Sequence, residues 1–193
     1  MNEITTVPAW GEYAMPQVPQ PFTPIAGKNT SYGITGLSTL ASNSAGAEVL
    51  ALNAQTGEVT LQRSGRFVIC GALYVAGALR KANPNATIDV MGALFIEIPP
   101  TPSPDPGVKT HTVRLGQTVV RLSALGELPY SGFSFAECTA LMLPMGTKIS
   151  LRVGIFADNL STGQFVGWQA RVDAAAGGAN LSIHELPGGV EGA

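Results

Sequence analysis

The chain has 193 residues and a formal net charge of −2 at pH 7, which suits one domain with a sizeable core. Charged residues make up 12% of the chain, about half of the usual share, and hydrophobic residues make up 45%. This balance excludes the basic surface with which proteins bind nucleic acid or an anionic membrane. It favours a subunit that buries uncharged surface in an assembly.

The chain starts with MNEITTVPAWGEY, which has neither a basic start nor an apolar run, so we expect no secretory signal. No later stretch approaches the ~18 uninterrupted apolar residues of a membrane span. We therefore expect a protein that is made in a reducing cytosol and has no membrane partner.

Residues 1–46 form a predicted extended arm and connector. Prolines recur at close spacing among aromatic residues, and proline fixes φ and removes a hydrogen-bond donor, so we expect extended structure outside any sheet interior. Aromatic side chains on a pre-extended segment suggest docking onto another protein, although a flexible tail is the alternative. Residues 27–46, rich in Gly, Ser, Thr and Asn, suggest a loose connector. The candidate partner-binding residues of the arm are Pro8, Trp10, Tyr13, Pro19, Pro21 and Phe22.

From residue 47 onward the pattern is all β. Strands recur every ~10–15 residues with turn signals between them, which is typical of an antiparallel sandwich or barrel. Gly116 is a candidate interruption of one strand, and residues 188–193 are an expected flexible tail after a domain spanning 47–187. The predicted strands cover residues 49–53, 58–63, 65–80, 88–98, 111–122, 130–143, 148–157, 165–173 and 180–186.

The stretch 65–80 is the centre of the predicted domain because it is apolar on both faces. One alternating set is Phe67, Ile69, Gly71, Leu73 and Val75, and the other is Val68, Cys70, Ala72, Tyr74 and Ala76. Antiparallel strands usually keep one polar face, so the second apolar face needs a second partner. A central strand covered by a loop or helix would also explain this pattern. We predict one set in the core and the other in an oligomer interface, with Val68, Cys70, Tyr74 and Met142 as candidate contacts.

Residues that could carry chemistry are sparse. His111 and His184 are the only histidines and do not form a ligand cluster, and no nucleophile or phosphate-binding motif occurs. Cys70 and Cys138 lie in predicted buried strands, where each is expected to act as a small hydrophobic residue, with a disulfide left open. We therefore predict no enzyme activity, no catalytic residues, no metal site and no cofactor.

Three segments carry a family resemblance. SGRFVICGALYVAG resembles the glycine–x–aromatic strand of the trimeric jelly rolls related to tumour necrosis factor and the complement globular heads. LMLPMGTKISLRVGIF is similar to that family's paired apolar strands around a glycine turn, and ANLSIHEL to its closing strand, although Thr147 replaces the usual acidic residue after Gly146. The resemblance covers residues 48–186 and implies an antiparallel jelly-roll sandwich that assembles as a homotrimer.

Without an expected secretory signal, the chain resembles the jelly-roll head-decoration (cement) proteins of tailed phages more than secreted ligands. That resemblance implies a virion structural protein on the capsid surface, whose partner is the major capsid protein. The alternative is a receptor- or glycan-binding tip module of a phage fibre or spike, with aromatic residues such as Tyr130 or Trp168 on distal loops.

Overall fold

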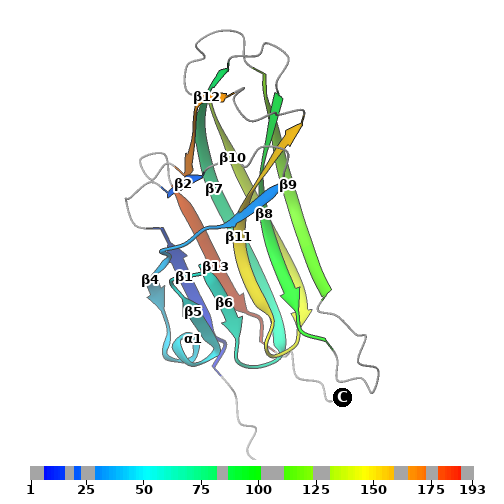
Figure 1. The fold of residues 1–193 in the computed structure, drawn as a ribbon. Helices are drawn as coiled ribbons and strands as arrows, with labels where there is room; N and C mark the ends of the chain where they lie inside the picture. The colour runs from blue at the N-terminus through cyan, green and yellow to red at the C-terminus, as the bar shows by residue number, and fades with distance from the viewer. Residues whose placement is uncertain are drawn as a thin grey trace, which may run out of the picture.

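The computed structural model is a sandwich of two antiparallel sheets that pack face to face (Figure 1). The structure describes residues 7–15, 20–22, 29–81, 87–100, 111–123, 131–158, 165–172 and 178–187. We name each sheet after its central strand. The β7 sheet contains β1 (Trp10–Ala14), β2 (Gln20–Phe22), β4 (Ser38–Ser42), β7 (Gly65–Lys81), β10 (Ser131–Leu143), β12 (Phe165–Val172) and β13 (Ala179–Glu185). The β11 sheet contains β3 (Thr30–Gly33), β5 (Leu50–Asn53), β6 (Glu58–Leu61), β8 (Thr87–Ile98), β9 (His111–Ser123) and β11 (Lys148–Asp158).

The strand order is that of a jelly roll. The β7 sheet runs β2-β12-β7-β13-β1-β4, with β10 also paired to β7, and the β11 sheet runs β5-β6-β11-β8-β9, with β3 also on β11. Successive strands cross between the sheets at β2–β3, β3–β4, β4–β5, β6–β7, β7–β8, β9–β10, β10–β11 and β11–β12. These crossings wrap the two sheets around one core, and the predicted all-β antiparallel jelly-roll fold is confirmed.

The core fills the space between the sheets. Strand β7 supplies Phe67, Ile69, Leu73 and Val75, each at most 2% exposed, and β11 supplies Ile149, Leu151, Val153 and Ile155 at 0%. Both sets have the facing predicted from their alternation. The sheets approach closely at Gly71, where an added Cβ would lie 2.7 Å from Cδ2 of Leu151. The candidate interruption at Gly116 is an irregularity and not a break: β9 continues through this residue, which has φ +56°, and the β8–β9 register shifts between Gly92 and Leu94.

The N-terminal segment is part of the sandwich, which corrects the prediction of a separate arm. Strand β1 lies between β13 and β4 and pairs with both. Tyr13 and Phe22 are 2% and 3% exposed within this one chain, so the expectation that another chain must bury them is wrong. The prolines misled the prediction because Pro8 and Pro16 stand on either side of the seven residues Ala9–Met15 and interrupt none of them.

Residues 29–46, the described part of the expected connector 27–46, form regular structure instead of a loose connector. They include β3, which pairs with β11, and β4, which pairs with β1. Ile34 and Leu37 are 0% and 1% exposed, so apolar burial fixes this stretch despite its composition. Helix α1 (Ser44–Val49) follows β4 and precedes β5. The described part of 1–46 thus belongs to the same sandwich as 47–187, while the expected tail 188–193 lies outside the described residues.

Candidate functional site

The outer face of the β7 sheet, which points away from the β11 sheet, is the most unusual surface in the described structure. Its side chains alternate with those of the core along each strand. Neighbouring strands are in register, so that Ala14, Asn180, Ala72 and Ala136 form one row across the sheet. The residues of this face are Trp10, Glu12, Ala14, Arg66, Val68, Cys70, Ala72, Tyr74, Ser134, Ala136, Cys138, Ala140, Met142, Asn180, Ser182 and His184.

This face is largely apolar and still open to solvent. Met142 on β10 is 62% exposed, and Leu40 beside β1 is 64% exposed. Among the described side chains of the face, Glu12 and Arg66 are the acidic and basic residues, and both are exposed. An exposed sheet face of this composition is typical of a surface that binds another protein.

The opposite face of the sandwich, on the β11 sheet, is charged. Arg152 forms an ion pair with Glu97 and lies 3.7 Å from Glu58, and Lys148 lies 3.7 Å from Glu58 as well. The guanidinium of Arg152 also stands 4.9 Å from the centre of the Phe95 ring. Ion pairs of this kind are typical of a solvent-exposed face. The outer face of the β11 sheet is therefore charged, whereas the outer face of the β7 sheet is largely apolar.

All four predicted interface residues lie on the outer face of the β7 sheet. Val68, Cys70 and Tyr74 alternate along β7, and Met142 stands opposite Arg66 on the neighbouring strand β10. Their contact with another subunit stays a prediction. The structure adds residues of β1 and β13 to this surface. They were not predicted, because prolines flank β1 and the outer positions of β13 are polar.

Cys70 and Cys138 form a disulfide, so the expectation of two buried hydrophobic thiols is wrong. The two residues are directly opposite each other on β7 and β10, with Cα atoms 4.1 Å apart. Both side chains belong to the outer face, and Cys138 is exposed. The apolar neighbours along the sequence suggested burial, whereas the pairing of strands 68 residues apart could not be read from the sequence.

A shallow hollow of about 230 Å³ opens on this outer face beside the disulfide. Its lining includes the disulfide, Ala72, Ala136, Glu12 and Leu40. Leu40 reaches the hollow because the β1–β4 pairing shifts register between Glu12 and Tyr13, which leaves Leu40 as the extra residue of a bulge. The hollow is therefore largely apolar, with Glu12 at its border on β1 and Glu137, Asn180 and Ser182 also in its lining.

Trp10 covers the β13 side of the same face. Its indole stacks on the His184 imidazole, with ring centroids 6.1 Å apart and planes inclined by 8°. The two residues are directly paired across β1 and β13, so the sheet register itself produces the stack. Sequence reasoning had placed Trp10 on a free arm and had given His184 no role.

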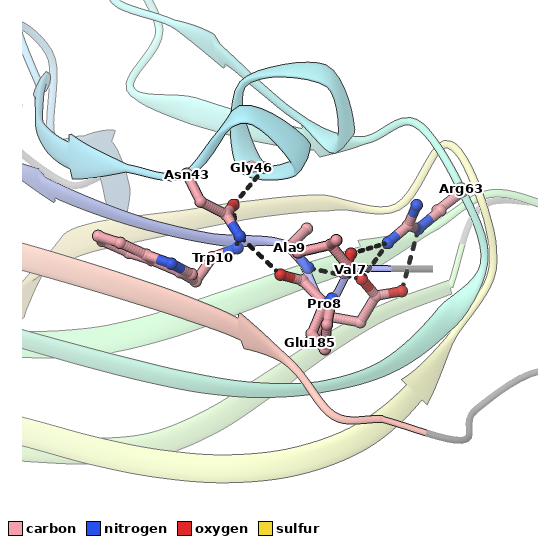
Figure 2. Close-up of polar contacts among 8 residues, drawn as sticks. All are labelled: Val7, Pro8, Ala9, Trp10, Asn43, Gly46, Arg63 and Glu185. Atoms are coloured by element: carbon pink, nitrogen blue, oxygen red, sulfur yellow. Dashed lines mark hydrogen bonds and ion pairs between the residues drawn. The ribbon is translucent and has the colours of Figure 1, made fainter. Parts of the chain in front are cut away.

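A cluster of polar contacts holds the start of β1 in place, and we call it the N-terminal clasp (Figure 2). The Ala9 amide donates to Glu185 Oε2 at 2.8 Å, and Arg63 donates to Glu185 through Nε at 3.0 Å and through Nη2. Arg63 Nη2 also donates to the Val7 carbonyl at 3.3 Å. Burial acts to raise the pKa of Glu185, but the hydrogen bonds from Arg63 and Ala9 outweigh it and hold that pKa below its ordinary value.

Asn43, the residue that caps helix α1, completes the clasp from the other side (Figure 2). Its Oδ1 accepts from the amides of Trp10 and Gly46 at 3.2 and 2.6 Å, and its Nδ2 donates to the Pro8 carbonyl at 2.8 Å. Only glycine fits at position 46, because a Cβ there would lie 1.9 Å from the Trp10 carbonyl oxygen. The clasp thus joins β1, α1, Arg63 and the end of β13.

The predicted arm residues divide into two groups. Tyr13 and Phe22 belong to the core, whereas Pro21 is exposed and Pro8 and Trp10 are half-buried. Pro19 lies outside the described residues. Partner binding stays a prediction for Pro8, Trp10 and Pro21.

The two histidines of the chain do not come together in the structure. His111 lies on β9 and His184 on β13, in different sheets, and the described part of the chain contains no cluster of three or more metal-binding side chains. Within the same residues, no helix has the length and apolar character needed to cross a bilayer.

Comparisons with known proteins find similar structures but no family. No protein-family model matches the chain, and no curated protein matches it in sequence. Murine APRIL, crystallised at pH 8.0, is 10% identical over 93% of this chain and 100% of that chain, with a TM-score of 0.49. Eiger TNF from S. frugiperda is 12% identical over 93% of this chain and 94% of that chain, with a TM-score of 0.46. At these values neither likeness assigns the chain a family, an activity or a partner.

Proposed function

We propose that this protein is a non-catalytic structural subunit that assembles with further copies of itself through the outer face of the β7 sheet. The observation that carries the proposal is the contrast between the two outer faces. The β11 sheet carries ion pairs on its outer face, whereas the outer face of the β7 sheet is apolar and exposes Leu40 and Met142. Burial of apolar area stabilises an assembly by about 25 cal/mol per Å², before the cost of association.

In its specific form, we propose that the subunit is a homotrimer that decorates a viral capsid and binds the major capsid protein. The low charge of the chain and its resemblance to phage cement proteins support this form. Among the described arm residues, Pro8, Trp10 and Pro21 are the candidates for contact with the shell. The disulfide between Cys70 and Cys138 is compatible with a particle released into oxidising surroundings, since such bonds rarely persist in a reducing cytosol.

A tip module of a phage fibre or spike is the second candidate, and one observation favours it. Residues 10–14 form an interior strand of the sheet, so this part of the arm is not free to spread over a shell. A tip module would also use an oligomeric jelly roll, and the two candidates differ in where the protein sits on the particle.

A matched pair of substitutions tests the assembly face. Ala140→Glu places a charge on β10 in the outer face of the β7 sheet, and Ala51→Glu places the same charge at an exposed position of β5 in the other sheet. We expect Ala140→Glu to dissociate the oligomer in sedimentation velocity, because a charge would be buried without a partner. Ala51→Glu should leave the oligomer intact, and equal behaviour of the two variants would contradict the proposal.

Electron cryomicroscopy of particles with and without the protein tests the virion assignment. Extra density on the capsid shell in the complete particle would support the decoration subunit. Density at the end of a fibre or spike would instead support the tip module, and a particle that lacks the protein altogether would contradict both.

A further inference from the structure

We propose that the hollow beside the disulfide receives Met142 from a second copy of this chain, and that Arg66 of that copy then faces Glu12. This inference rests on the proposed assembly through the outer face of the β7 sheet. It names the side chains that hold two copies together, and it follows from two complementary patches on that one face.

The first patch is the hollow. Its volume of about 230 Å³ exceeds that of the cavities of ~150 Å³ that hold a benzene-sized group, so one long side chain fits within it. Its lining by Ala72, Ala136, the disulfide and Leu40 is apolar, and Glu12 lies at its border. The hollow is therefore suited to an apolar side chain that has a basic residue beside it.

The second patch is the pair Met142 and Arg66. Met142 on β10 stands directly opposite Arg66 on β7, and both side chains are exposed on the same outer face. Methionine is unbranched and adapts to irregular apolar sites, which makes it suited to fill such a hollow. Arg66 beside it supplies the positive charge that matches Glu12.

The two patches of one molecule cannot satisfy each other. Cys138 at the hollow and Met142 are four residues apart along β10, which is about 13 Å in a strand. Their side chains point in the same direction from a rigid sheet, so Met142 cannot turn back into its own hollow. A second copy brings the complementary patch, and since every copy carries both halves, the contacts can close into a symmetric assembly.

Methionine truncation tests the apolar half of this contact with a built-in control. Met142 and Met145 are each 62% exposed, but Met145 lies in the turn after β10 and not on the outer face of the β7 sheet. We expect Met142→Ala to raise the dissociation constant of the oligomer about tenfold or more in sedimentation equilibrium, and Met145→Ala to leave it unchanged. Equal values for the two variants would overturn the inference.

Charge exchange tests the polar half. Glu12→Lys and Arg66→Glu should each raise the dissociation constant at low salt about tenfold or more, because each brings like charges together. The double variant Glu12→Lys/Arg66→Glu should restore an affinity close to that of the unmodified protein. At concentrations where the chain is monomeric, all three variants should melt at the same temperature as the unmodified protein, since both positions are exposed.

The outcomes separate this inference from the proposed function. A double variant that binds no better than the single variants would overturn the Met142–hollow contact, while an oligomeric unmodified protein would still support assembly through this face. If the unmodified protein is monomeric, both the assembly and this contact are wrong.

Discussion

At the scale of single residues, Glu185 connects the two ends of the described chain. Its carboxylate accepts hydrogen bonds from Arg63 and from the amide of Ala9, and its own amide donates to the Ala9 carbonyl at 2.7 Å. The side chain of Glu185 is 10% exposed and that of Arg63 is 34% exposed, so water screens the pair only in part. Glu185 therefore fixes both the start of β1 and the end of β13.

We expect Glu185→Gln to lower the free energy of unfolding by about 1–2 kcal/mol at pH 7. The pKa of Glu185 is lowered in the folded state, so its contribution is complete above the unfolded value of about 4.3 and is lost as the pH falls through the folded value. Thermal melting of both proteins between pH 7 and pH 2 should show the difference disappear at the acid end. A difference that stays constant with pH, or one as small as that of Gln55→Ala at an exposed turn position, would contradict the role of the clasp.

The disulfide gives a second prediction at this scale. Cys70 and Cys138 close a loop of 68 residues, and such a cross-link stabilises the folded state by roughly 2–4 kcal/mol, largely through the unfolded chain. A reducing agent should therefore lower the urea midpoint of the unmodified protein. The double variant Cys70→Ala/Cys138→Ala should have the lower urea midpoint from the start, and the reducing agent should not change it. If the reducing agent also leaves the midpoint of the unmodified protein unchanged, the disulfide is not present.

At the scale of elements, the long apolar strands could be predicted from the sequence, whereas the short strands near prolines could not. The predicted strand 65–80 is observed as Gly65–Lys81, and the predicted strand 148–157 as Lys148–Asp158, because each has a long apolar period. Strand β1 was missed although Ala9, Gly11, Tyr13 and Met15 alternate with outer-face residues. A strand of five residues between two prolines carries too little pattern to outweigh the expectation that proline-rich segments avoid sheets.

The candidate site was predictable only in part, for a physical reason. The sequence indicated the second apolar face of β7, since alternation is a local property. It could not reveal the disulfide, the Trp10–His184 stack or the Leu40 bulge, because each depends on the pairing of strands distant in sequence. Register between such strands is set by tertiary packing.

The inclusion of β1 in the core is tested by two neighbouring substitutions. Tyr13→Ala should lower the stability of the isolated protein by about 3–5 kcal/mol, because it empties a buried aromatic site. At concentrations where the chain is monomeric, Glu12→Ala at the adjacent exposed position should change it by no more than about 0.5 kcal/mol. Urea unfolding of the two variants decides, and an unaffected Tyr13→Ala protein would mean that β1 is not part of the folded sheet.

At the scale of the whole molecule, the jelly roll separates two tasks. One outer face carries the ion pairs of Arg152 and is suited to water, and the other carries the apolar row around the disulfide. An exposed apolar face on a chain of low total charge is typical of an interaction site. We therefore propose that further copies of the chain cover this face.

Light scattering on the purified, oxidised chain tests that claim most directly. We expect an assembly, with a mass of three times the 19.9 kDa of one chain, at micromolar concentration and without any added partner. A mass of twice that of one chain would still support burial of the outer face of the β7 sheet, but it would contradict a homotrimer. A mass of 19.9 kDa throughout the micromolar range would contradict the account.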